Sequence, residues 1–137
     1  MIEYKKVDGS FDLTGRNAIV VGGGGGIGGS TAEMYAKKGA NVAIVDCKDN
    51  VNEVAEELAK KYGVKTIGVK CDVTKQSDVE NTVKAVVDAF GEINILANMP
   101  GYVELESAEL IGIDIVERHI AINAVGVFRM CQAVANQ

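Results

Sequence analysis

The residues with the clearest chemical potential are a run of glycines followed by an aspartate. Gly supplies 16 of the 137 residues, and seven of them fall between Gly22 and Gly29, interrupted only by Ile27. Glycines after a strand permit a tight turn, and the next helix then points free N–H groups and its positive dipole end at an anion. This segment therefore predicts a cradle for the diphosphate of a dinucleotide; a flexible turn is the simpler alternative.

Asp46 ends the next apolar run, where a carboxylate can bind the ribose of such a cofactor. It can accept hydrogen bonds from both hydroxyls of the adenosine ribose, and it would repel the extra 2′-phosphate of NADP. The glycine segment contains no Lys or Arg that could attract this phosphate. We therefore expect NAD as the cofactor and NADP to be disfavoured, the alternative for Asp46 being a cap on the following helix.

Alternating strands and helices must position these residues. Apolar runs predict strands over 17–21, 41–46, 65–70 and 93–97, and helical periodicity predicts helices over 27–38, 51–62 and 77–90. Asn50 and Ser77 are predicted helix caps, each with a Glu three residues later. Strands separated by helices must be parallel and joined by right-handed crossovers. The chain is thus predicted to form one α/β domain over 1–137 with a doubly wound sheet.

The end of the sequence is predicted to be helical. The helical pattern runs from about Ser107, with one long helix over 114–134. Apolar residues lie on nearly all sides of this helix, which predicts that it is buried or lies in an interface.

Composition excludes several classes of function. The net charge is −5, the chain has no Trp, and its Lys and Arg are not clustered, which argues against a nucleic-acid partner. No apolar stretch is long enough to span a membrane, and residues 1–15 lack the apolar core of a signal sequence. The three cysteines are odd in number and far apart, which favours reduced thiols and a cytoplasmic location. No His, Cys and Asp have metal-site spacing, so no metal is expected.

Four segments, taken in order, resemble one family of enzymes. Gly22-x-x-x-Gly26-Ile27-Gly28 resembles the glycine loop of the short-chain dehydrogenase/reductase family, although a polyglycine run also fits the Gly-x-Gly-x-x-Gly spacing of other dinucleotide folds. The further segments are Cys71-Asp72-Val73-Thr74, Phe90 to Gly101 with its turn Asn98-Met99-Pro100-Gly101, and Ile122-Asn123-Ala124-Val125-Gly126-Val127-Phe128. Together they extend the resemblance over about residues 11–137, and the chain is identified as a member of this family.

The resemblance implies a function and a set of site residues. Family members transfer a hydride between a nicotinamide and an alcohol or carbonyl substrate, usually as dimers or tetramers, so a homo-oligomer is expected. Asn123 corresponds to the catalytic Asn of the family, the alternative being a polar residue that bonds backbone within its helix. The implied cofactor-binding residues are Gly22, Gly26, Ile27, Gly28, Asp46, Asp72, Val73, Asn98 and Gly101.

The sequence also departs from the family pattern. Val21 replaces a usual Thr, and Met99 and Pro100 replace residues of the turn. None of the four tyrosines has a Lys four residues later, and the catalytic Ser, Tyr and Lys would follow Gln137. The resemblance therefore implies a Rossmann-type sheet truncated after about four strands, with strand 93–97 at an open edge. We expect this chain alone to be inactive; the competing hypothesis is a non-catalytic dinucleotide-binding or oligomerisation module.

Overall fold

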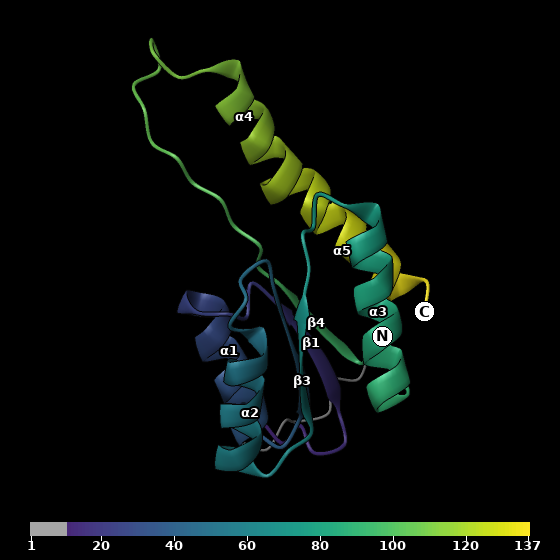
Figure 1. Ribbon diagram of the computed structural model, residues 1–137. Coiled ribbons are helices and arrows are strands. Elements are labelled where there is room, and N and C mark those ends of the chain that lie inside the picture. The colour runs from purple at the N-terminus through teal and green to yellow at the C-terminus, as the bar shows by residue number, and fades with distance from the viewer. Residues whose placement is uncertain (1–10) are drawn as a thin grey trace, which may run out of the picture.

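A computed structural model describes residues 11–137 as a four-stranded parallel sheet between two layers of helices (Figure 1). The predicted lack of a signal sequence concerns residues that lie mostly outside this range. The strands are β1 (Asn17–Val21), β2 (Asn41–Asp46), β3 (Thr66–Lys70) and β4 (Ile95–Asn98). The helices are α1 (Gly26–Lys37), α2 (Val51–Tyr62), α3 (Gln76–Phe90), α4 (Ile113–Ile120) and α5 (Val127–Ala135), with a π-helical segment (Ala121–Gly126) joining the last two.

The strand order β3-β2-β1-β4 confirms the predicted doubly wound topology. The chain moves outward from β1 to β3 and then returns to pair β4 with the other side of β1, so that Val21 lies between Val45 and Asn98. In such sheets, ligands bind outside the carboxyl ends of the strands where the winding direction reverses. That point lies between β1 and β4, and β4 forms the sheet edge, as predicted.

The sheet is buried because its apolar strands are covered on both faces. All five residues of β1 are buried, as expected for a central parallel strand. Helices α1 and α2 cover one face, and α3 and α5 cover the other (Figure 1). Small side chains on α1 allow its close approach to the sheet, since its fully buried residues are Gly28, Ala32 and Ala36.

Of the two predicted helix caps, Asn50 lies at the N-cap position of α2 without a capping side-chain bond, and the Ser77 cap is wrong. Helix α2 starts directly after Asn50, but the Asn50 side chain donates from Nδ2 to the Gly24 carbonyl, 3.0 Å away. Helix α3 starts at Gln76, before Ser77, and has no side-chain cap. The Asn50 side chain finds a backbone partner in a distant loop, which local spacing cannot reveal.

The C-terminal helix differs from its prediction in two ways. Residues 107–112 form a turn and an irregular segment instead of a helix, although the helix over 113–135 is continuous through its π segment. The predicted burial holds in part: α5 packs on the sheet through the buried Met130, whereas α4 has no buried residue and projects from the body (Figure 1). Ile113 and Phe128 are 71% and 65% exposed. A role in an interface stays a prediction. None of the helices within residues 11–137 is long and apolar enough to cross a membrane.

Candidate functional site

The glycine segment forms a tight turn in which backbone approaches backbone. Gly22 has φ +81°, and a Cβ there would lie 2.4 Å from the Met99 carbonyl oxygen. At Gly28 a Cβ would lie 2.0 Å from the Gly22 carbonyl oxygen, and Gly26 has φ +57° with open space around it. The backbone thus requires glycine at the three positions of the Gly-x-x-x-Gly-x-Gly spacing.

The start of α1 presents unpaired donors. The first helical bond runs from Gly29 N to Gly25 O at 3.0 Å, so the N–H groups of Gly26, Ile27 and Gly28 have no earlier carbonyl to bond within the helix. No side chain caps this end and no acidic residue lies in its first turn. The positive end of the helix dipole is therefore available to an anion.

Asp46 is fastened to this loop by hydrogen bonds. Its Oδ2 accepts from Gly24 N at 3.0 Å, and its Oδ1 accepts from Lys48 N at 3.2 Å. The Asn50 side chain donates from Nδ2 to the carbonyl of the same Gly24. The Oδ1 atom of Asn50 is buried without a hydrogen-bond partner. The carboxylate is thus fixed at the end of β2, beside the free amides of α1.

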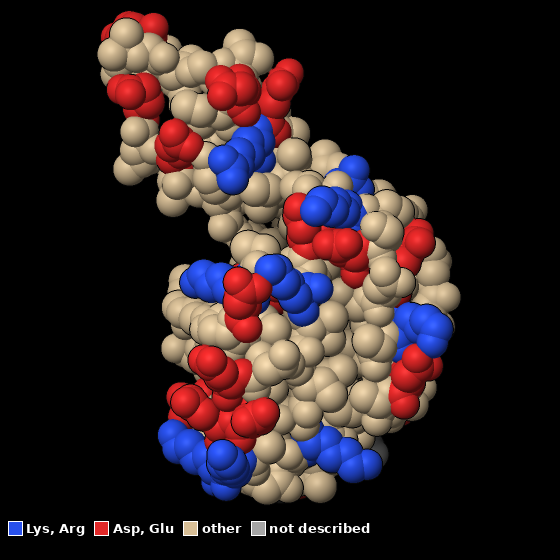
Figure 2. All heavy atoms as spheres, in the orientation of Figure 1, with Lys and Arg blue, Asp and Glu red and all other residues tan. Residues whose placement is uncertain are grey.

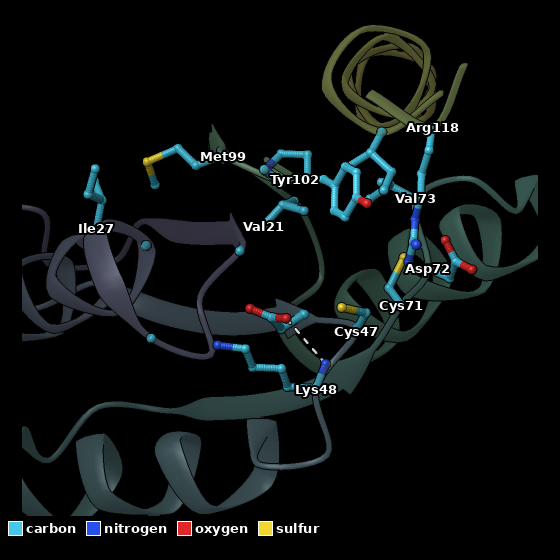
Figure 3. A pocket seen from close by; sticks show the side chains of 17 residues that line it. Val21, Ile27, Cys47, Lys48, Cys71, Asp72, Val73, Met99, Tyr102 and Arg118 are labelled. Carbon is cyan, nitrogen blue, oxygen red and sulfur yellow. Dashed lines mark hydrogen bonds between the residues drawn. The ribbon is translucent and has the colours of Figure 1, made fainter. Parts of the chain in front are cut away.

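A cavity of about 580 Å³ runs from the glycine loop and Asp46 to the ends of β3 and β4. This volume lies within the usual range for small-molecule and cofactor sites. Figure 2 shows the surface hollowed between the projecting α4 and the body, and Figure 3 shows the lining. Of the predicted residues, Gly22, Ile27, Gly28, Asp46, Asp72, Val73 and Gly101 line the cavity, whereas Gly26, Asn98 and Asn123 do not.

Asp72 already has partners of its own. Its Oδ1 accepts from Thr74 Oγ1 at 2.6 Å and Thr74 N at 3.0 Å, and Lys75 Nζ lies 3.6 Å from Oδ2. The Thr74 hydroxyl and amide and the Lys75 charge hold the pKa of Asp72 below its usual range. Its N–H donates to Asp78 Oδ2 at 3.1 Å. Asp72 thus presents a charged carboxylate at the cavity while its amide is occupied.

Asn98 joins the end of β4 to the C-terminal helix. Its Nδ2 donates to the Val127 carbonyl at 2.8 Å and to Cys131 Sγ at 3.3 Å, while its Oδ1 is buried without a partner. A π-helical turn disturbs the regular backbone bonding just before Val127. Asn98 therefore holds the helix against the sheet instead of lining the cavity.

Asn123 binds the backbone of the loop after β4. Its Oδ1 accepts from Tyr102 N and its Nδ2 donates to Tyr102 O, both at 2.8 Å. The alternative, a bond within its own helix, is therefore wrong. The pair of bonds fixes the segment that follows Gly101 against the helix, and the catalytic role of Asn123 stays a prediction.

Sequence reasoning missed three polar residues of the lining: Lys48, Tyr102 and Arg118. The Arg118 guanidinium lies 4.5 Å from the centre of the Tyr102 ring (Figure 3). The Tyr102 hydroxyl donates to Glu104, which raises the pKa of Tyr102. A Cβ on Gly25 would lie 3.8 Å from Lys48 Nζ, so a cation faces the glycine loop although none lies within it. The four-residue spacing of Arg118 and Ile122 places them on one helix face. The sequence does not indicate that this face lies toward the cavity.

Comparison with known proteins decides the family. The family model for short chain dehydrogenase matches residues 16–137. The chain belongs to the short-chain dehydrogenase family. It is 31% identical over 134 residues to the NAD-dependent glycerol dehydrogenase of Listeria innocua, covering 98% of this chain and 52% of that protein.

Solved structures of family members superpose closely on this chain. A xylitol dehydrogenase bound to NAD⁺ has a TM-score of 0.86 at 31% identity, covering 91% of this chain and 48% of its own. The L-sorbose reductase of Gluconobacter frateurii, complexed with NADPH and L-sorbose, has a TM-score of 0.86 at 26% identity. The match covers 93% of this chain and 49% of the reductase chain. The chain spans about half the length of the proteins it matches.

Proposed function

We propose that this chain is the cofactor-binding half of an NAD-dependent oxidoreductase that transfers a hydride between nicotinamide and an alcohol or carbonyl substrate. The observation that carries the proposal is the Asp46 carboxylate, fixed by the Gly24 amide next to the free N–H groups of α1. This arrangement combines an anion site with an acceptor for ribose hydroxyls. We propose that residues 1–137 constitute a single dinucleotide-binding domain.

The residues present fit a dinucleotide along the cavity. The amides of Gly26, Ile27 and Gly28 would hold the diphosphate, because they are unpaired within the helix and no side chain fills the space at Gly26. Asp46 would accept from the adenosine ribose, and Asp72 and Val73 would border the adenine. Gly101 would lie near the nicotinamide ribose. The bound nicotinamide supplies the hydride chemistry, and the protein residues orient it.

The proposal favours NAD over NADP because of the charge at the end of β2. A fixed carboxylate at Asp46 repels a 2′-phosphate, whereas the Lys48 ammonium facing the glycine loop partly offsets this repulsion. Among the relatives, the xylitol dehydrogenase binds NAD⁺ and the sorbose reductase binds NADPH. We place Asp46 as the dominant group, since the loop amide holds it directly beside the site.

The substrate class we propose is a small polyhydroxy compound. The names of the compared proteins support it, since they refer to glycerol, xylitol and sorbose. The sequence of 137 residues contains no Tyr followed four residues later by Lys, so a proton donor of that type would have to come from further chain. The 137-residue chain alone is proposed to bind cofactor without turnover.

A non-catalytic binding or oligomerisation module is the second candidate. The observation in its favour is the apolar surface of the C-terminal helix, where Ile113, Ile120 and Phe128 are exposed. A homo-oligomer would cover these side chains. In this alternative the domain binds a dinucleotide as a ligand and no further chain supplies catalytic groups. The cytoplasmic location also stays a prediction.

Calorimetric titration of the purified chain with NAD and with NADP tests the cofactor assignment. We expect NAD to bind more tightly. Asp46→Asn should weaken NAD binding and reduce the preference, whereas Lys48→Gln should weaken NADP binding more than NAD binding. Glu53→Gln, on α2 and outside the cavity lining, is a control that should change neither affinity. Equal NAD affinity in Asp46→Asn and the unmodified chain would refute the assigned role of Asp46.

A further inference from the structure

Two cysteines occupy equivalent positions at the ends of neighbouring strands. In the parallel pair β2–β3, Asp46 lies opposite Lys70. Cys71 N donates to the Asp46 carbonyl at 2.9 Å, which completes the bonding of this last pair. Cys47 and Cys71 are therefore the first residues after this pair on their two segments, and the ladder ends there because Lys48 N donates to Asp46 Oδ1 at 3.2 Å.

Both cysteines border the same cavity, and Cys71 also packs into the core beneath α3 and α5. Val45 and Val69, two residues before each cysteine, both pack in this core. Figure 3 shows Cys47 and Cys71 between Lys48 and Asp72.

The spacing of two neighbouring strands suits a disulfide bond. Adjacent strands lie about 4.8 Å apart, and the Cα atoms of a disulfide usually lie about 4.4–6.8 Å apart. We propose that Cys47 and Cys71 form an oxidisable thiol pair, which a peroxide converts to a disulfide at the adenosine end of the cavity. The third cysteine, Cys131, lies on α5 beside Asn98 and is not part of the pair.

Exposure assigns a different role to each thiol. Cys47 is exposed, whereas Cys71 is only 2% exposed, so a peroxide in solution reaches Cys47 first. The Cys47 thiolate attacks one peroxide oxygen, the O–O bond breaks, and Cys47 becomes a sulfenic acid with release of hydroxide or alkoxide. The Cys71 thiol then attacks the sulfenic sulfur, forming the S–S bond and releasing water. The two thiols lose two electrons, and the peroxide gains them.

The surroundings of the pair set its pH dependence. Partial desolvation at the end of β2 and the adjacent Asp46 carboxylate raise the pKa of the otherwise exposed Cys47. Burial raises the pKa of Cys71; the Thr82 hydrogen bond opposes this rise, and the Asp78 and Asp72 charges add to it. Lys70 and Lys75 on the neighbouring segments are paired with carboxylates, and Lys48 and Arg118 are the cations that line the same cavity. Because the thiolate is the reactive form, oxidation should accelerate as the pH rises.

The disulfide would affect the proposed cofactor site. Cys47 follows Asp46 and Cys71 precedes Asp72, so a bond between them alters the backbone that carries both carboxylates. This consequence rests on the proposed function, whereas formation of the disulfide does not. We expect about tenfold weaker NAD binding in the oxidised chain, corresponding to the loss of about one hydrogen bond to the ribose.

Peptide mapping after peroxide treatment tests the pair directly. The folded 137-residue chain, with Cys131→Ser to prevent linkage between molecules, is treated with hydrogen peroxide, alkylated and digested with trypsin without reductant. Cleavage after lysine yields peptides 39–48 and 71–75, which carry one cysteine each. We expect these two peptides to be joined, with the loss of two hydrogen atoms, faster at pH 9 than at pH 7. The variant Cys47→Ser, at the exposed position, should leave Cys71 unoxidised.

The other outcomes contradict the proposal. If Cys47 is oxidised further or linked to a second molecule while Cys71 stays free, or if neither cysteine reacts, no such pair exists. If the disulfide forms but NAD affinity is unchanged after oxidation and after reduction by dithiothreitol, the effect on the site is refuted. If the reduced chain fails to bind NAD, the proposed function fails while the disulfide result stands.

Discussion

Gly28 offers the sharpest test of how the glycine turn is built. An Ala side chain there would place its Cβ 2.0 Å from the Gly22 carbonyl oxygen, 2.6 Å from its carbon and 3.1 Å from Gly23 N. All three atoms are backbone, so no flexible side chain can move aside. The neighbouring Gly29 is a matched control on the same helix, since its Cβ would lie 3.6 Å from the Gly23 carbonyl oxygen, an ordinary contact.

The two substitutions should change stability in opposite directions. In a helix, Ala is favoured over Gly by about 0.5–1 kcal/mol, so Gly29→Ala should be neutral or stabilising. In Gly28→Ala the overpacking cost of about 1–3 kcal/mol exceeds that gain. The turn must also open, so NAD affinity should fall in Gly28→Ala alone.

Urea unfolding followed by circular dichroism measures the difference in the free energy of unfolding, and calorimetry measures NAD affinity. Equal stability of the two variants would refute the close backbone contact at Gly28.

Three further predictions concern the contacts around the site. Asn98→Ala removes the donor to the Val127 carbonyl, and it should lower the free energy of unfolding by about 1–3 kcal/mol in urea titrations; an unchanged midpoint would contradict the role of Asn98 in holding the helix. Thr74→Val removes the main hydrogen bond that lowers the pKa of Asp72. A lowered carboxylate pKa stabilises the fold above the unfolded-state pKa of about 4, and this contribution disappears as the pH falls through the folded pKa. The variant should therefore lose less stability than the unmodified chain between pH 7 and pH 3, and an identical loss would count against this contribution. Asn123→Ala releases the Tyr102 backbone, so limited proteolysis within 102–112 should accelerate while cleavage elsewhere is unchanged; equal cleavage rates would show that these bonds do not hold the loop.

The sequence predicts the sheet well because its signals are local. The apolar runs that become β1 and β2 are buried on both faces, and each is bounded by residues that end a strand. The glycine positions are also readable, since backbone geometry at Gly22 and Gly28 admits no side chain. Such requirements leave a direct trace in residue type.

The features that sequence reasoning missed depend on contacts between distant segments. Asn50 has the residue type of a helix cap but bonds the Gly24 carbonyl, 26 positions earlier in the chain. Lys48 reaches the cavity because β2 ends beside the glycine loop, and Arg118 reaches it from the distant helix α4. The apolar pattern of the last helix predicts burial or an interface, and nothing within residues 11–137 covers Ile113 or Phe128. Periodicity reports which faces are apolar and does not report what covers them.

The most direct test of the central claim is an NMR titration of the ¹⁵N-labelled chain with NAD. If NAD binds in this cavity, the amide resonances of Gly26, Ile27, Gly28 and Gly24 should shift together in a saturable manner, and Asp46→Asn should weaken the response. Shifts confined to other regions, or no shift in the folded chain at millimolar NAD, would contradict the assignment of this cavity as a dinucleotide site.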